Sequence, residues 1–233
     1  FETVTYLLDG RMQHEDSAGN SGELNPGDVQ WMTAGRGIIH SEEPHDEFRR
    51  TGGRTHGFQI WVNLPAEHKM MAPRYQEIPS EESPTVYQEG VWARVIAGEC
   101  MGQKSSISTI IPIKLIHVRM NPDSVLSQEI ESDLNSMIYV FRGKIVIDNQ
   151  LEVRDHPLPR GLGVSQQVRD GELAVLSKGK KIKIRSDVDS EFLILAGPEI
   201  DEPVARYGPF VMNTWEEINQ AITDYQNGNF LNP

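Results

Sequence analysis

The sequence of 233 residues contains a single cysteine, Cys100, and no Asn-x-Ser/Thr signal for N-glycosylation. One cysteine cannot form an internal disulfide bond, so this composition is typical of an intracellular protein of the cytoplasm or, in a eukaryote, the nucleus. No apolar run approaches the ~20 residues of a membrane span. Positive charge is also scarce, with 22 basic against 34 acidic residues and a formal net charge of −12. Direct nucleic-acid binding is therefore disfavoured, because it needs a basic surface.

The first residues, FETVTYLLDG, lack an initiator Met, a signal peptide and an N-terminal cap, and they begin directly on an alternating strand pattern. We therefore expect the native protein to have an upstream segment that this chain omits. A site that takes ligands from that segment would be incomplete here.

Strand patterns dominate the rest of the chain. Short runs rich in Val, Ile and Tyr are separated by Gly, Asn, Asp or Pro, which is typical of an all-β sandwich or barrel. Only the end of the chain has a helical pattern, with Thr214 as N-cap, Glu217 three residues later and Gly228 as a stop signal.

Two pairs of segments indicate an internal repeat. YLLDGRM at 6–12 matches YVFRGKI at 139–145, and GDVQWMTAG at 27–35 matches GELAVLSKG at 171–179. The offset rises from 133 to 144, which we assign to an insertion in the loop RDHPLPRGLG. The chain thus resembles two copies of one β unit. We expect the following domains: an N-terminal barrel at 1–68, a proline-rich connector at 69–84, and a C-terminal barrel with the helix at 85–233.

A possible metal site lies in the stretch WMTAGRGIIHSE at 31–42. His40 and Glu42 are two residues apart, so in a strand both side chains project from one face. Imidazole and carboxylate together suit iron, manganese, nickel or zinc. The alternative is the solvated face of a half-buried strand. The second repeat has Ile184 and Ser186 at these positions, which favours a metal site in the first copy alone.

The turn before His40 contains Gly35 and Gly37, which permit backbone conformations that direct the following strand. Three apolar residues flank this turn: Trp31, Met32 and Ile39. They are interpreted either as the lining of a pocket around the metal or as part of the core.

Several long motifs resemble the pirin family of the cupin superfamily, almost from end to end: FETVTYLLDG, HEDSAG, NPGDVQWMTAGRGIIHSE, WVNLP, PRYQEI, VIAGE and GPFVMNTWEEINQAITDYQNGNF. The resemblance implies two tandem cupin-type (jelly-roll) β-barrels with a short C-terminal helix. It also implies that the N-terminal barrel alone binds a metal, usually Fe(II), or another divalent transition metal. His40 and Glu42 match two of the family's ligands, and two further histidines are expected upstream of this chain. The resemblance assigns no ligand role to His14 and Asp16, which share the same spacing.

The resemblance leaves two functional classes open. The first is a quercetin 2,3-dioxygenase type of oxidoreductase, which acts on a flavonol-like small molecule with O₂ and uses Glu42 as the catalytic base. The second is an iron-containing, redox-sensitive co-regulator that binds a transcription factor. The acidic composition suits contact with a basic partner protein. The same site could serve either function.

Overall fold

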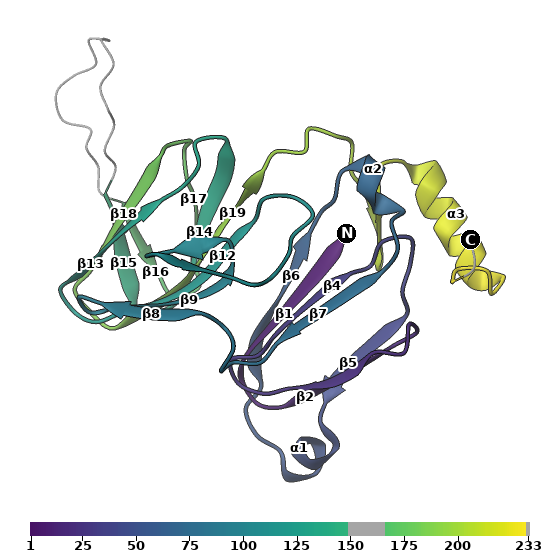
Figure 1. Ribbon diagram of the computed structural model, residues 1–233, viewed down its shortest axis with the longest axis horizontal. Coiled ribbons are helices and arrows are strands. Elements are labelled where there is room, and N and C mark those ends of the chain that lie inside the picture. The colour runs from purple at the N-terminus through teal and green to yellow at the C-terminus, as the bar shows by residue number, and fades with distance from the viewer. Residues whose placement is uncertain (149–165, 232–233) are drawn as a thin grey trace. The chain divides into compact units, whose positions relative to one another are not determined.

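The structure is a computed structural model that describes residues 1–148 and 166–231 (Figure 1). The chain divides into two compact units, Phe1–Glu82 with Ile200–Pro233 and Ser83–Glu199. Each unit is built from β-sheets, and the longest helix lies near the C-terminus. The predicted all-β architecture of two tandem barrels with a short C-terminal helix is therefore confirmed.

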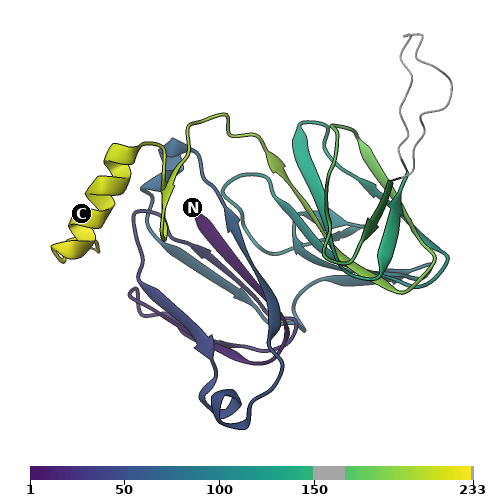
Figure 2. The ribbon, with the colours of Figure 1, turned by 180° about the vertical axis from the view of Figure 1, so that it is seen from behind.

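The N-terminal part of the first unit, Phe1–Glu82, contains two sheets, with strand orders β6-β1-β4-β7 and β3-β2-β5 (Figures 1 and 2). Their strands are β1 (Glu2–Asp9), β2 (Met12–Asp16), β3 (Ser21–Leu24), β4 (Val29–Thr33), β5 (His40–Pro44), β6 (His56–Val62) and β7 (Arg74–Ile78). Two short helices, α1 (Asp46–Thr51) and α2 (Ala66–Lys69), flank β6 along the chain. Strand β1 is buried on both faces, with Val4 and Tyr6 on one face and Thr3 and Thr5 on the other. This polar second face supports the candidate site.

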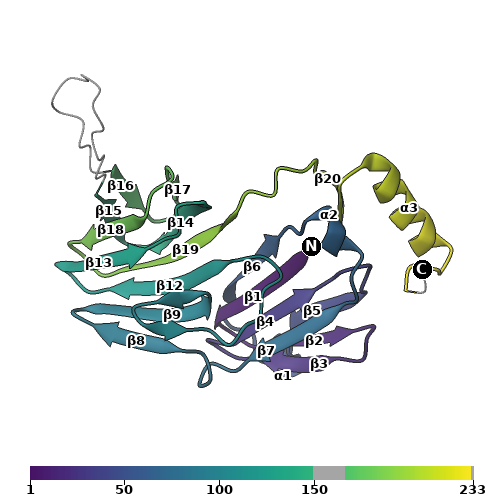
Figure 3. The ribbon, with the colours of Figure 1, turned by 45° about the horizontal axis from the view of Figure 1, so that its top comes forward.

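The second unit contains a six-stranded sheet, β17-β14-β19-β12-β9-β8, and a four-stranded sheet, β13-β18-β15-β16, with the hairpin β10-β11 (Figure 3). The strands are β8 (Thr85–Gln88), β9 (Val91–Ala97), β10 (Glu99–Cys100), β11 (Gln103–Lys104), β12 (Lys114–Met120), β13 (Ser124–Glu129), β14 (Leu134–Arg142), β15 (Lys144–Ile147), β16 (Gln166–Arg169), β17 (Leu173–Val175), β18 (Lys181–Ser186) and β19 (Ser190–Pro198). An apolar core that includes Ile116, Ile138, Ile184 and Phe192 fills this unit.

Strand pairing is equivalent in the two units. Strand β1 pairs with β4 and β6, as β14 pairs with β17 and β19. Strand β2 pairs with β3 and β5, as β15 pairs with β16 and β18. The repeat predicted from the sequence therefore corresponds to a shared topology. The loop to which we assigned the insertion lies outside the described residues.

The C-terminal segment contains the hairpin β20 (Ala205–Tyr207) and β21 (Phe210–Met212), followed by α3 (Trp215–Gln226). The predicted helix start is confirmed, because Thr214 Oγ1 accepts the Glu217 N–H at 3.2 Å and Glu217 Oε2 accepts the Thr214 N–H at 2.8 Å. Ile218 is the buried residue of this helix. No helix within the described ranges is long and apolar enough to cross a membrane.

The structure divides the chain differently from the expected boundaries. Residues 200–233 group with the first unit rather than with the C-terminal barrel. A hydrogen bond from the Ala66 N–H to Glu202 Oε2, at 2.7 Å, ties this segment to α2. The expected connector at 69–84 contains β7, which pairs with β4. Its prolines flank this strand instead of preventing it, because Pro73 precedes β7 and Pro79 follows it.

Candidate metal centre

Strands β2 and β5 bring four polar residues to one face of the smaller sheet. In their antiparallel register His14 lies opposite Glu42, and Asp16 lies opposite His40. Directly opposite residues project to the same side of a sheet, and so do residues two apart on one strand. Potential ligand atoms of His14, His40 and Glu42 all lie within 4.8 Å of one another. The structure therefore brings His40 and Glu42 together and adds His14.

The larger sheet holds the Glu42 side chain from the opposite direction. Thr5 on β1 is paired with Gln30 on β4 and with Gln59 on β6, so the three side chains form a row. Thr5 Oγ1 and Gln30 Nε2 donate hydrogen bonds to Glu42 Oε1 at 2.9 and 3.0 Å, and Gln59 Nε2 donates to Oε2 at 2.5 Å. The carboxylate thus lies between the two sheets, fixed by three donors.

Gln30 also connects Glu42 to His14, because its Nε2 lies 3.1 Å from His14 Nδ1. An ionised carboxylate only accepts hydrogen bonds, so the Gln30 atom that faces it is the amide nitrogen. His14 Nδ1 then accepts a hydrogen bond, and the ring hydrogen lies on Nε2, 3.6 Å from Asp16 Oδ2. The His14 ring is 1% exposed and stacks on Tyr75. In this arrangement His14 supports the position of Glu42 through Gln30.

Electrostatics favour the metal-binding form of His40. Although His40 is an exposed residue, partial desolvation by the surrounding protein lowers the pKa of its imidazole, and the charge of Glu42 opposes the effect only in part. The neutral ring, which has a free lone pair for a metal, therefore persists to lower pH than in an unperturbed histidine. Imidazole and carboxylate, the side chains of His40 and Glu42, are also common donors in non-haem iron sites. The residues present fit a divalent transition metal.

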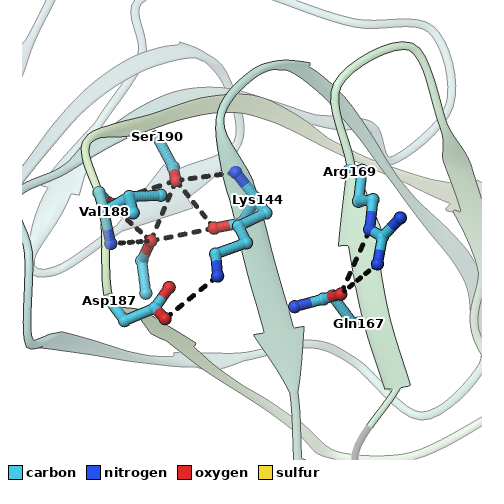
Figure 4. Close-up of polar contacts among 7 residues, drawn as sticks. Lys144, Gln167, Arg169, Asp187, Val188 and Ser190 are labelled. Carbon is cyan, nitrogen blue, oxygen red and sulfur yellow. Dashed lines mark hydrogen bonds and ion pairs between the residues drawn. The ribbon is translucent and has the colours of Figure 1, made fainter.

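The second unit differs at the corresponding positions, as the repeat predicted. Ile184 is fully buried and lies opposite Ile147 in the pairing of β18 with β15. Ser186 Oγ contacts Ser190 Oγ at 2.8 Å and donates to the Lys144 carbonyl oxygen at 2.9 Å. Figure 4 shows Ser190 hydrogen-bonded to Lys144 within this cluster. Across the described ranges, the first unit alone gathers three residues suited to hold a metal.

A cavity of about 650 Å³ adjoins the metal centre in the first unit. His40 and Gln59 line it, and so do the predicted pocket residues Met32 and Ile39. Trp31 is fully buried and is not among the lining residues. It projects from the opposite face of β4, because neighbouring residues of a strand alternate in direction.

Sequence reasoning missed the three residues that hold Glu42: Thr5, Gln30 and Gln59. Their positions depend on the register of three strands, which a single sequence does not contain. One local signal was available, since Thr3 and Thr5 alternate with Val4 and Tyr6 and thereby mark a polar face on a buried strand.

Comparisons with known proteins identify the family of this chain. The family model described as Pirin matches residues 1–62, and that described as Pirin C-terminal cupin domain matches residues 115–231. Human Pirin is 41% identical over 230 residues, which cover 97% of this chain and 73% of that protein. A crystal structure of quercetin 2,3-dioxygenase from Acinetobacter baumannii is similar with a TM-score of 0.88 and 33% identity, over 99% of this chain and 76% of that one.

Proposed function

Because the chain belongs to the pirin family of cupin proteins, we propose that it is a metal-dependent dioxygenase that oxidises a flavonol-like substrate with O₂. The observation that carries this proposal is that His40, which lies beside Glu42, lines a largely apolar cavity. The cavity volume, about 650 Å³, lies in the range of sites for small organic ligands. Similarity to a protein solved as a quercetin 2,3-dioxygenase supports the substrate class.

His40 and Glu42 would hold the metal, Fe(II) or another divalent ion, together with the two upstream histidines that the family resemblance implies. When bound, the metal supplies Lewis-acid and one-electron chemistry toward a phenolate and O₂. Glu42 accepts the proton of the substrate hydroxyl group. A substrate bound next to His40 brings this hydroxyl group within hydrogen-bond reach of the Glu42 carboxylate. Gln59 donates a hydrogen bond to Glu42 and also lines the cavity, so it positions this base beside the cavity.

The test replaces Glu42 in a chain extended at its N-terminus by the histidine pair that the family resemblance implies. Glu42→Gln keeps the shape of the side chain but cannot accept a proton, so we expect flavonol turnover to fall by about 10²-fold or more while the fold is retained. Circular dichroism checks the fold, and product formation from quercetin under O₂ measures turnover.

Glu43→Gln is the matched control, since Glu43 is the next residue of β5, is exposed and pairs with Arg49 on the surface. Its turnover should equal that of the unchanged protein. Equal turnover of Glu42→Gln and Glu43→Gln would remove Glu42 from the mechanism. Absence of flavonol turnover in the iron-loaded unchanged protein would favour the redox-sensitive co-regulator instead.

A further inference from the structure

The cavity beside His40 has a wall that comes from the far end of the chain. Thr3, Met32 and Trp61 are neighbours in the register of the larger sheet and form one side. The loop at 34–39 forms a second side. Ten further lining residues belong to the C-terminal segment: Pro209, Phe210, Val211, Met212, Glu217, Gln220, Ala221, Asp224, Tyr225 and Phe230. A ligand in this cavity therefore contacts residues separated by almost the whole sequence.

Phe230 packs directly against the loop that leads into His40. A Cβ atom added to Gly37 would lie 2.8 Å from Phe230 Cζ, so the aromatic ring occupies the space that any larger residue would need. Gly37 also has a φ of +141°, which other residues rarely adopt. The ring makes edge-to-face contacts with Phe210 and Tyr225, with centroid distances of 5.7 and 5.9 Å. Phe230 thus joins the C-terminal wall to the loop of the metal centre.

The beginning of this wall is fixed independently of Phe230. Glu202 Oε2 accepts hydrogen bonds from the Ala66 N–H at 2.7 Å and from Asn213 Nδ2 at 2.9 Å. The Arg206 guanidinium lies 4.7 Å from the centre of the Trp61 ring, a cation–π distance. Figures 1 and 3 show α3 at the end of the first unit where α2 lies. Removing Phe230 should therefore change the cavity without releasing the whole segment.

The lining indicates the chemical class of the ligand. The lining offers the flat aromatic rings of Trp61 and Phe210 and the flexible apolar side chain of Met32. Side chains of these kinds suit an aromatic ring system. Glu217 and Asp224, on one face of α3, add two carboxylates to the same lining, and Arg36 adds one guanidinium. Carboxylates accept hydrogen bonds, and their excess over the guanidinium repels anions, so the lining favours hydroxyl groups on the ligand over acidic groups.

We propose that Phe230 is a specificity-determining residue, which limits the cavity beside His40 to planar, hydroxylated, neutral aromatic molecules. The proposal deepens the proposed function and rests on it for the class of substrate. It requires no role for Phe230 in metal binding or in proton transfer. The expected consequence of removing this ring is a change in the relative affinity for small and large aromatic ligands.

The experiment measures binding of two probes by fluorescence titration, without O₂ and without added metal. The probes are 2-naphthol, with two fused rings, and quercetin, with a further ring. Phe230→Ala leaves space for the additional ring of quercetin. We therefore expect the ratio of the two dissociation constants to shift in favour of quercetin by roughly five- to tenfold, which corresponds to the free energy of one aromatic contact. Tyr207→Ala is the matched control, because Tyr207 is an exposed aromatic residue of the same segment outside the lining.

Two further variants keep the proposal testable where Phe230→Ala does not fold. Phe230→Leu retains apolar volume and should shift the ratio less, in the same direction. Gly37→Ala should produce a similar shift, because the new methyl group displaces the ring. An unchanged ratio in the folded Phe230 and Gly37 variants would overturn the proposal, as would an equal shift in Tyr207→Ala. Tighter binding of 2-naphthoate than of 2-naphthol would overturn the assigned ligand class.

The outcomes also separate this proposal from the proposed function. A shifted ratio in a protein that does not turn over quercetin would support the role of Phe230 and contradict the dioxygenase. Turnover of quercetin with an unchanged ratio would contradict the role of Phe230 alone. Failure of 2-naphthol or of quercetin to bind the unchanged protein would count against the role of Phe230 and against the dioxygenase.

Discussion

Gln30 is the residue that couples the two sheets at the candidate metal centre. Its amide nitrogen serves Glu42 and His14 together, and the side chain is fully buried. Outer partners of this kind orient ligands, and their loss typically lowers metal affinity by about 10- to 100-fold. We therefore expect Gln30→Leu to weaken metal binding to this degree, because Leu has similar volume but donates no hydrogen bond. Chelator competition measures the affinity.

Gln13→Leu provides the control for this substitution. Gln13 is the neighbour of His14 on β2, and its side chain projects from the other face of that strand. Its metal affinity should match that of the unchanged protein. Equal affinities for all three proteins would show that the hydrogen bonds of Gln30 do not position Glu42.

At the scale of single elements, Glu191 on β19 links three strands of the six-stranded sheet. His117 and Arg119 on β12 and Arg142 on β14 each contact this carboxylate, at 3.4, 3.3 and 2.9 Å. The pKa of Glu191 is lowered to about 2. The hydrogen bond with His117 contributes most to this shift, the two arginines add to it, and burial opposes it. Glu191 thus favours the folded state in its ionised form.

The sign of the pH dependence follows from this lowered pKa. The stabilisation is fully present above the usual glutamate pKa of about 4.3 and is lost as the pH falls toward 2. We expect Glu191→Gln to lower the free energy of unfolding by roughly 1 kcal/mol at pH 7, allowing for solvent screening of a partly exposed group. The difference from the unchanged protein should shrink between pH 4 and 2. Urea denaturation measures it, with Glu129→Gln, an exposed strand residue, as control. A constant difference would contradict the assignment.

Local patterns were sufficient to predict several of the strands and the C-terminal helix. The runs KLIHVRM and KIVI coincide with β12 and β15, and the capping residues Thr214 and Glu217 begin α3 as expected. Such elements are visible because the signal lies within a few neighbouring residues. Strand β7 was missed because Pro73 and Pro79 resemble linker residues, although the strand between them satisfies its hydrogen bonds by pairing with β4.

At the scale of the whole chain, the repeat predicted which unit carries candidate ligands. In the second unit Ile184 is buried and Ser186 is hydrogen-bonded, whereas in the first unit Glu42 accepts a hydrogen bond from Gln30 and His40 lies beside it. The sequence could not place His14 beside them, because that contact depends on the pairing of β2 with β5. Long-range register of this kind arises only when the sheets assemble.

The number of ligands that the whole chain supplies determines how firmly it holds a metal. His40 and Glu42 are two ligands, and the His14 lone pair at Nδ1 is engaged by Gln30. Stable transition-metal sites normally use three or four protein ligands, so residues 1–233 alone should retain metal weakly. Addition of the upstream histidine pair that the family resemblance implies should give one metal per chain, and His40→Ala should then remove it. Elemental analysis after gel filtration tests both proteins, with His45→Ala, a surface histidine at the start of α1, as control. Tight one-to-one metal in the shorter chain, lost in His14→Ala, would show that His14 rotates out of its contact with Gln30 and acts as a ligand itself.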